Sequence, residues 1–192
     1  MLSVAKSSIQ IPRWQVLVQL ALAAEKNARE LINDAEVLLA AARWPRAYAL
    51  AVLAHDEFGK GLTAMALAAA HPDLRQPARL RELTGGHIRK LTSTYEHEAQ
   101  VGPPERWAEV GRSQELARSA NERKQRGLYV DFANDGSLRL PSDVGEEEAR
   151  AQVASVRKTV FTAGLRGMPF WPSPKVVKPI NSLANPGAII AA

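Results

Sequence analysis

The sequence predicts an all-α protein, a mainly antiparallel helical bundle that carries a small β-hairpin insert. Three observations lead to this fold class. Apolar residues recur at three- and four-residue steps over most of residues 14–165, which is the period of an amphipathic helix. Prolines and glycines divide that pattern into separate segments. Only the stretch 128–141 changes to two β-prone runs around an Asp-Gly pair.

The first two predicted helices account for much of the apolar content. One runs from about Trp14 to Ala42, with an apolar stripe on one side and charged residues on the other. Pro45 suits the first turn of the next, because its missing N–H costs little there. That second helix extends to about Ala70, stops before Pro72 and is apolar nearly all round. Such a helix is normally central and buried.

Further helical segments follow the central one. Pro77 can start a third segment, which the glycines at 85 and 86 break or kink because glycine has a high backbone-entropy cost in a helix. The next helix has apolar residues at helical spacing, namely Ile88, Leu91, Tyr95 and Ala99. After the stop at 102–104, a strongly charged helix is predicted over about 104–126.

A hairpin and a last helix complete the predicted domain. The runs 128–132 and 137–141 flank the Asp-Gly turn. Asp143, followed three residues later by Glu146, resembles a capping box, and the helix it starts runs to about Leu165. We therefore expect an irregular lead over residues 1–13, a helical domain over 14–166 and a proline-rich, extended or disordered tail over 167–192.

Composition excludes several classes of protein. The chain of 192 residues has no cysteine, which rules out a disulfide scaffold, a thiolate metal site and a cysteine nucleophile. It has no signal-peptide core and no run of about 18 apolar residues, so we expect a cytoplasmic protein without a membrane span. Neither Glu-x-x-His, His-x-x-x-His nor a glycine-rich phosphate loop occurs, so we expect no metal and no cofactor.

The net charge of +5 is compatible with a nucleic-acid partner. Both signs are mixed along the whole chain, however, and a solvated, well-mixed surface explains the same composition.

The central helix contains a first candidate site. A carboxylate on an apolar helix face is costly unless it is paired, and Glu57 has Lys60 as its i+3 neighbour. The pair is either a structural ion pair that fixes helix register or a functional site with a shifted pKa. His55 lies on another apolar face of the same helix. A lone histidine in such a position is more often a core residue than a catalytic one.

A second candidate site lies around the paired glycines. Arg81 and His87 are separated by five residues, and Lys90 follows His87 on the same side of a helix. An imidazole beside two cations suits a phosphodiester, because the imidazole can transfer a proton and the cations offset phosphoryl charge. The alternative is a solvated, basic start of a helix.

Three blocks in order resemble the AbiV family of abortive-infection (phage-defence) proteins, within the wider HEPN group. They are residues 27–60, which include Glu57 and Lys60, residues 86–90 with the sequence GHIRK, and residues 122–132 with the sequence ERKQRGLYVDF. Together they span roughly residues 14–165. The resemblance implies a HEPN-like helical bundle, often dimeric, that stops phage multiplication by shutting down translation or attacking RNA.

The resemblance also implies roles for individual residues. Many HEPN proteins are metal-independent ribonucleases with an arginine and a histidine four to six residues further on, a spacing that Arg81 and His87 match. His87 would then be the acid/base group and Arg81 would stabilise the transition-state phosphate. Lys90 would bind the RNA backbone, and Glu57 with Lys60 would orient the site.

Three functions are therefore open at this point. The first is a toxin-like ribonuclease that acts as a homodimer and cleaves RNA without a metal. The second is a translation inhibitor that acts by binding alone and is triggered by a phage activator protein. The third is a helical accessory or antitoxin-like module with no activity of its own. The sequence does not name the RNA target or the phage trigger.

Overall fold

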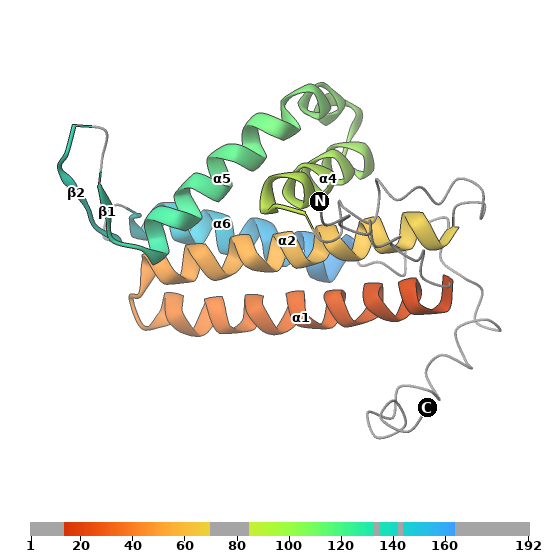
Figure 1. Ribbon diagram of the computed structural model, residues 1–192, viewed down its shortest axis with the longest axis horizontal. Helices are drawn as coiled ribbons and strands as arrows, with labels where there is room; N and C mark the ends of the chain where they lie inside the picture. The colour runs from red at the N-terminus through yellow and green to blue at the C-terminus, as the bar shows by residue number, and fades with distance from the viewer. Residues whose placement is uncertain (1–13, 70–84, 133–134, 142–143, 164–192) are drawn as a thin grey trace, which may run out of the picture.

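The computed structural model describes residues 14–69, 85–132, 135–141 and 144–163. The predicted all-α fold is confirmed for these residues, which form five α-helices, a 3-10 helix, a π-helical turn and a very short hairpin (Figure 1). The α-helices are α1 (Trp14–Ala40), α2 (Trp44–Ala69), α4 (His87–Val101), α5 (Ser113–Leu128) and α6 (Glu146–Lys158). No helix among the described residues combines the length and the apolar character that crossing a membrane requires.

Helix α2 is the centre of the bundle, as its apolar sequence predicts. It contacts α1, α4, α5 and α6, and α1 runs antiparallel along one side of it (Figure 1). The turn between the two helices is tight, with Ala42 at a φ of 55°. A helix with neighbours on most sides keeps only a narrow, partly exposed stripe, here around Glu57 and Lys60, which is why α2 is apolar nearly all round.

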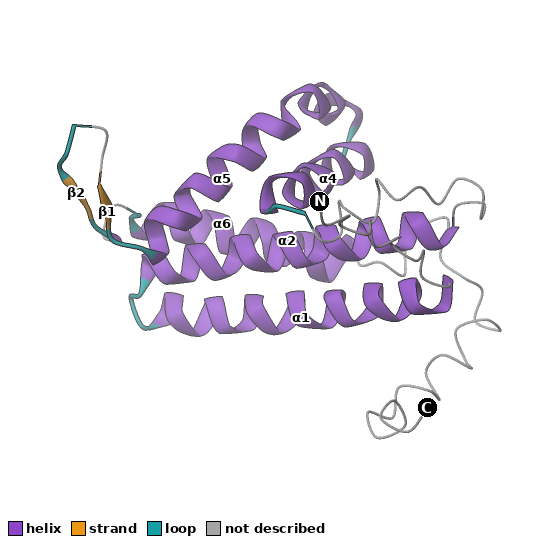
Figure 2. Cartoon of the chain, viewed as in Figure 1, coloured by secondary structure: helices purple, strands orange, loops and turns teal. Residues whose placement is uncertain are grey.

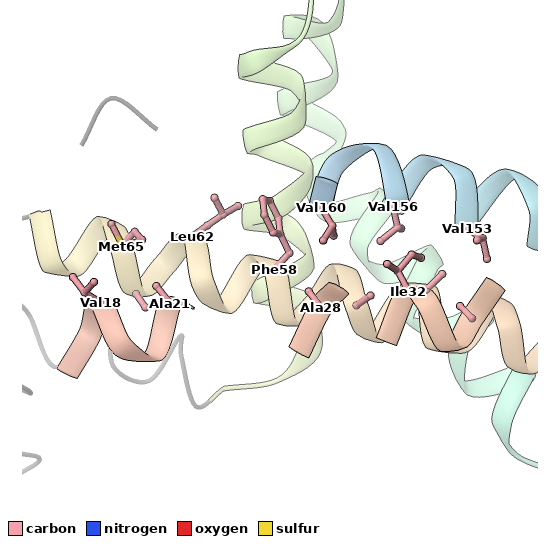
Figure 3. Packing of buried hydrophobic residues seen from close by; sticks show 14 of the residues in the cluster. Val18, Ala21, Ala28, Ile32, Phe58, Leu62, Met65, Val153, Val156 and Val160 are labelled. Atoms are coloured by element: carbon pink, nitrogen blue, oxygen red, sulfur yellow. The ribbon is translucent and has the colours of Figure 1, made fainter. Parts of the chain in front are cut away.

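The main core lies between α1, α2 and the C-terminal helical segment (Figure 3). Ile32 of α1 and Phe58 of α2 are fully buried, and Val156 of α6 completes the contact. Removing such side chains from water stabilises a fold by roughly 1.5–3 kcal/mol each. A second, smaller cluster joins α2 to α4, α5 and α6 around Val52 and Leu91.

Two glycines bring helix backbones unusually close together. A Cβ on Gly59 of α2 would overlap the carbonyl oxygen of Lys90 and the hydroxyl oxygen of Thr94, both on α4. A Cβ on Gly127, near the end of α5, would lie 2.5 Å from the carbonyl oxygen of Pro45. Glycine at these positions therefore sets how closely α4 and α5 approach the central helix.

The prediction of one helix over 104–126 is wrong in its first half. Residues Pro104–Arg112 form a 3-10 helix, η2, and α5 begins only at Ser113. No residue of η2 is buried, and a short helix without a packed apolar face gains little from α-helical geometry.

The C-terminal helix also differs in detail from the prediction. Helix α6 starts after Gly145 without a side-chain cap, and Asp143, the expected cap, lies outside the described residues. After Lys158 the chain continues as a π-helical turn, η4 (Thr159–Ala163). A π-helical turn widens the backbone by one residue, a feature that amphipathic spacing does not reveal.

The hairpin is shorter than the two five-residue runs that predict it. Strand β1 (Asp131–Phe132) pairs antiparallel with β2 (Leu138–Arg139), and the pair projects from the helical body beside the end of α5 (Figure 2). Gly136 has a φ of 82° in the connecting turn, where glycine avoids steric strain. The lead 1–13, the segment predicted to start at Pro77 and the tail from 167 lie outside the described residues.

Candidate functional site

A buried aspartate on the central helix gathers cations from two other helices. Asp56 is 2% exposed. Its Oδ2 accepts a hydrogen bond from His87 Nδ1 at 3.0 Å and forms an ion pair with Lys90 Nζ at 2.9 Å. Lys124 of α5 interacts electrostatically with the same carboxylate. We call these four residues the Asp56 cluster. It forms where α2, α4 and α5 meet.

The start of α4 explains why two members of the cluster reach one carboxylate. His87 and Lys90 are three residues apart, so both side chains leave the same side of the helix. The close approach at Gly59 holds this part of α4 against α2. Asp56 thus faces the first turn of α4 and is shielded from water by it.

His87 is anchored at one ring nitrogen, while 44% of its side chain is exposed. A carboxylate can only accept hydrogen bonds, so Nδ1 of His87 must donate to Asp56. In the neutral imidazole the other nitrogen, Nε2, then has a free lone pair. An imidazole fixed in this way can accept a proton at Nε2 from a molecule that binds at its exposed side.

Lys124 contributes a buried positive charge that has no direct partner within the part of the chain that the structure describes. The residue is 2% exposed, and neither its Nζ nor the Oδ1 atom of Asp56 has a hydrogen-bond partner among the described residues. Burial lowers the pKa of Lys124 below its usual value; the nearby Asp56 opposes this effect and Lys90 reinforces it. The buried ammonium of Lys124 therefore lowers the stability of the fold at neutral pH.

We expect Lys124→Met to raise the stability of the protein by roughly 1 kcal/mol near pH 7, because it removes a buried, unpaired ammonium. The advantage should shrink as the pH rises. The folded pKa of Lys124 is lowered, so between that pKa and the ordinary value of about 10.4 the unfolded chain binds more protons than the folded one. The free energy of unfolding of the wild type therefore rises with pH over this range, and the advantage of the Met variant becomes smaller.

Urea unfolding of both proteins at about pH 7 and about pH 10 measures this difference. A Met variant that is less stable than wild type at both pH values would show instead that Lys124 stabilises the fold through Asp56.

A groove opens beside His87. It has a volume of about 800 Å³ and lies between the start of α4, at Gly85–Arg89, and one face of α5. The α5 wall consists of Gln114, Arg118 and Asn121. The groove thus places two arginines, Arg89 and Arg118, close to the exposed histidine.

Only some of the predicted site residues come together in the structure. His87 and Lys90 meet at Asp56, and the ammonium of Lys90 is buried against that carboxylate. Glu57 and Lys60 form the expected ion pair, with both side chains partly exposed. Within the described ranges, no hydrogen bond or ion pair links this pair to the Asp56 cluster. Arg81 lies outside the described residues.

Sequence reasoning missed Asp56 and Lys124. The available signal was the position of Asp56 in a helix that is apolar nearly all round, since a carboxylate buried there must have a cationic partner. Nothing in the charged sequence around Lys124 distinguishes it from its exposed neighbours on α5.

His55, next to Asp56, belongs to a separate buried cluster. It is 1% exposed, its Nε2 lies 2.9 Å from Glu98 Oε1, and Thr159 donates to the same oxygen. Burial tends to raise the pKa of Glu98, but the hydrogen bond and charge of His55, aided by Thr159 and Arg106, hold that pKa below its usual value. The cluster joins α2 and α4 to η4. No group of three or more potential metal-ligating side chains occurs in the described part of the chain.

The chain is similar to one known family. A family model, HEPN_AbiV, described as AbiV, matches residues 16–161. The match covers nearly all of α1 and the whole of α2 to α6, and it includes every member of the Asp56 cluster. No curated protein and no solved structure matches the chain.

Proposed function

The chain belongs to the AbiV family, and we propose that this HEPN-type abortive-infection protein is a metal-independent ribonuclease with His87 as its acid/base group. The observation that carries the proposal is the hydrogen bond from His87 Nδ1 to the buried Asp56. It fixes the imidazole in one tautomer and leaves Nε2 open, which is the arrangement that a general base requires.

The proposed reaction needs only a proton carrier and positive charge. Nε2 of His87 removes the proton from a ribose 2′-hydroxyl, and the 2′-oxygen attacks the adjacent phosphorus. The bond from phosphorus to the 5′-oxygen breaks, the proton passes to that oxygen, and the RNA is left with a 2′,3′-cyclic phosphate. Arginines stabilise the charge that develops on the phosphoryl oxygens. Arg81 retains this proposed role, and Arg89 and Arg118 line the groove beside His87.

Lys90 has a different role in this proposal from the one the resemblance implies. Its ammonium lies 2.9 Å from Asp56 and is buried, so it holds the carboxylate in place rather than contacting the RNA backbone. A carboxylate that is fixed by a buried cation has fewer accessible rotamers than a mobile carboxylate. It therefore holds the His87 imidazole in a narrower range of orientations.

Incubation of the purified protein with total bacterial RNA in EDTA tests the proposal. The reactions are run with and without an extract of phage-infected cells, in case a phage activator is needed. Discrete fragments that end in a 2′,3′-cyclic phosphate are the expected product. RNA that stays intact under both conditions would overturn the ribonuclease assignment and favour a protein that blocks translation by binding.

We expect Asp56→Asn to lower RNA cleavage by up to about 10,000-fold, because the carboxylate that orients the imidazole is lost. An asparagine amide can donate to His87 as well as accept, so it no longer selects the tautomer with a free Nε2. Nitrogen chemical shifts of the His87 ring should show a single tautomer in the wild type and a mixture in the variant. Full activity with a mixed tautomer would show that Asp56 has only a structural role.

A further inference from the structure

The groove beside His87 has the features of a binding site for one unpaired nucleotide. We propose that Arg118, Asn121 and Gln114 of α5, together with Arg89 of α4, bind the nucleotide next to the phosphate that is cut, so that the substrate is single-stranded RNA. The inference rests on the proposed ribonuclease function, because it places the bound nucleotide relative to His87. It adds a substrate class and a set of binding residues to that function.

The three α5 residues form one stripe along the wall of the groove. Positions 114, 118 and 121 are separated by four and then three residues, so their side chains lie on one face of the helix. Arg89 lies on the other wall, near the first turn of α4, where His87 also lines the groove. A volume of about 800 Å³ is within the range of sites for small organic ligands.

Arg118 differs from the other arginines on and around α5. Arg112, Arg123 and Arg126 each form an ion pair with a glutamate. Neither Arg118 nor Arg89 has a carboxylate partner within the described ranges, and both are exposed. Two uncompensated guanidinium groups on opposite walls suit a phosphate, because the planar fork of arginine donates two parallel hydrogen bonds to it.

The amide side chain of Asn121 favours a groove that recognises a base as well as a phosphate. Its Oδ1 is buried and has no hydrogen-bond donor among the described residues, although the side chain lines the groove. An unsatisfied buried acceptor is costly, and rotation of the amide would present that oxygen to an N–H group of a bound base. Gln114, which lies beyond Arg118 on the same stripe, offers a second amide of the same kind.

These groups favour an unpaired nucleotide over duplex RNA. Amide side chains read the hydrogen-bonding edge of a base, which is occupied when the base is paired. The major groove of an RNA duplex is too deep and narrow for side chains to enter. In-line attack by a 2′-hydroxyl also needs a backbone that can leave duplex geometry. An unpaired, flexible strand therefore meets the requirements of both base binding and cleavage.

Binding can be tested separately from cleavage in a His87→Ala background, which removes turnover. The probe is a fluorescein-labelled single-stranded RNA of mixed sequence, and the same strand annealed to its complement serves as the duplex. Fluorescence anisotropy gives the Kd of each over a series of salt concentrations. We expect the single strand to bind at least about tenfold more tightly than the duplex.

Three variants divide the proposed contacts in that background. Arg118→Ala should weaken binding of all sequences by roughly five- to tenfold and reduce the slope of log Kd against log salt by about 0.7. Gln114→Ala and Asn121→Ala should leave the slope unchanged and alter the ranking of four homopolymeric RNAs. Arg150→Ala, on an exposed surface of α6, removes the same charge outside the groove and should change neither quantity.

The outcomes separate this inference from the proposed function. If the wild type cleaves RNA but the three groove variants bind like Arg150→Ala, the groove assignment is overturned and the ribonuclease stands. If the groove variants lose binding as expected but the wild type cleaves no RNA, the ribonuclease falls and the groove stands as an RNA-binding site. Equal affinity for single strand and duplex would overturn the choice of an unpaired nucleotide. Circular dichroism at the assay temperature verifies that each variant is folded.

Discussion

His87→Ala is expected to reduce RNA cleavage by about 100- to 10,000-fold, the contribution that a positioned acid/base group makes. The fold should be unaffected. The His87 side chain is 44% exposed, and its one hydrogen bond within the described residues is to Asp56, so its removal takes little from the core. The cleavage rate under single-turnover conditions and the melting temperature measure the two effects separately.

His97→Gln is the matched control, because this second histidine of α4 has no contact with Asp56 among the described residues. It lies beside Phe58, with ring centroids 6.2 Å apart, and burial lowers its pKa. It should retain wild-type cleavage. Equal losses in both variants would show that disturbance of α4, rather than loss of the His87 imidazole, stops the reaction.

Gly59→Ala is expected to destabilise the fold by at least about 3 kcal/mol, although alanine is the better helix former by about 1 kcal/mol. The added Cβ would overlap the Lys90 carbonyl oxygen, which is backbone and cannot rotate away. Helix α4 must therefore move from α2, and with it Lys90 and His87 move from Asp56. Stability and cleavage should fall together, as measured by urea unfolding and by the RNA assay.

Gly111→Ala provides the comparison, because a Cβ at that position meets nothing within 4 Å. Its stability should stay within about 1 kcal/mol of the wild type. If Gly59→Ala unfolded at the same urea concentration as Gly111→Ala, the close approach of α2 and α4 would not be a constraint on the fold.

Much of the bundle follows from local patterns in the sequence. The boundaries of α1 and α2 agree with the apolar spacing, and the central position of α2 follows from the absence of a polar face. The same reasoning does not predict the 3-10 helix over residues 104–112, where no residue is buried. Periodicity shows which face a helix could bury, whereas the neighbours decide whether it is buried.

The candidate site could be predicted only in part. His87 and Lys90 can be found from their chemistry and spacing, which are properties of one short segment, and from the family resemblance, which spans three ordered blocks. Their shared partner was not found, because Asp56 lies 31 residues before His87 in the chain. The ion pair between Lys90 and Asp56 could not be predicted either, because no local pattern brings the two side chains together.

The sequence by itself determined the helical class, the central helix and the histidine at the start of α4, since helix period and side-chain chemistry are local properties. Only the tertiary structure decided which cations meet Asp56, which arginines remain unpaired and where a groove opens. Those outcomes depend on how closely helices approach one another. At α2 and α4 that distance is set by a glycine, Gly59, whose missing Cβ matters only once the Lys90 backbone lies against it.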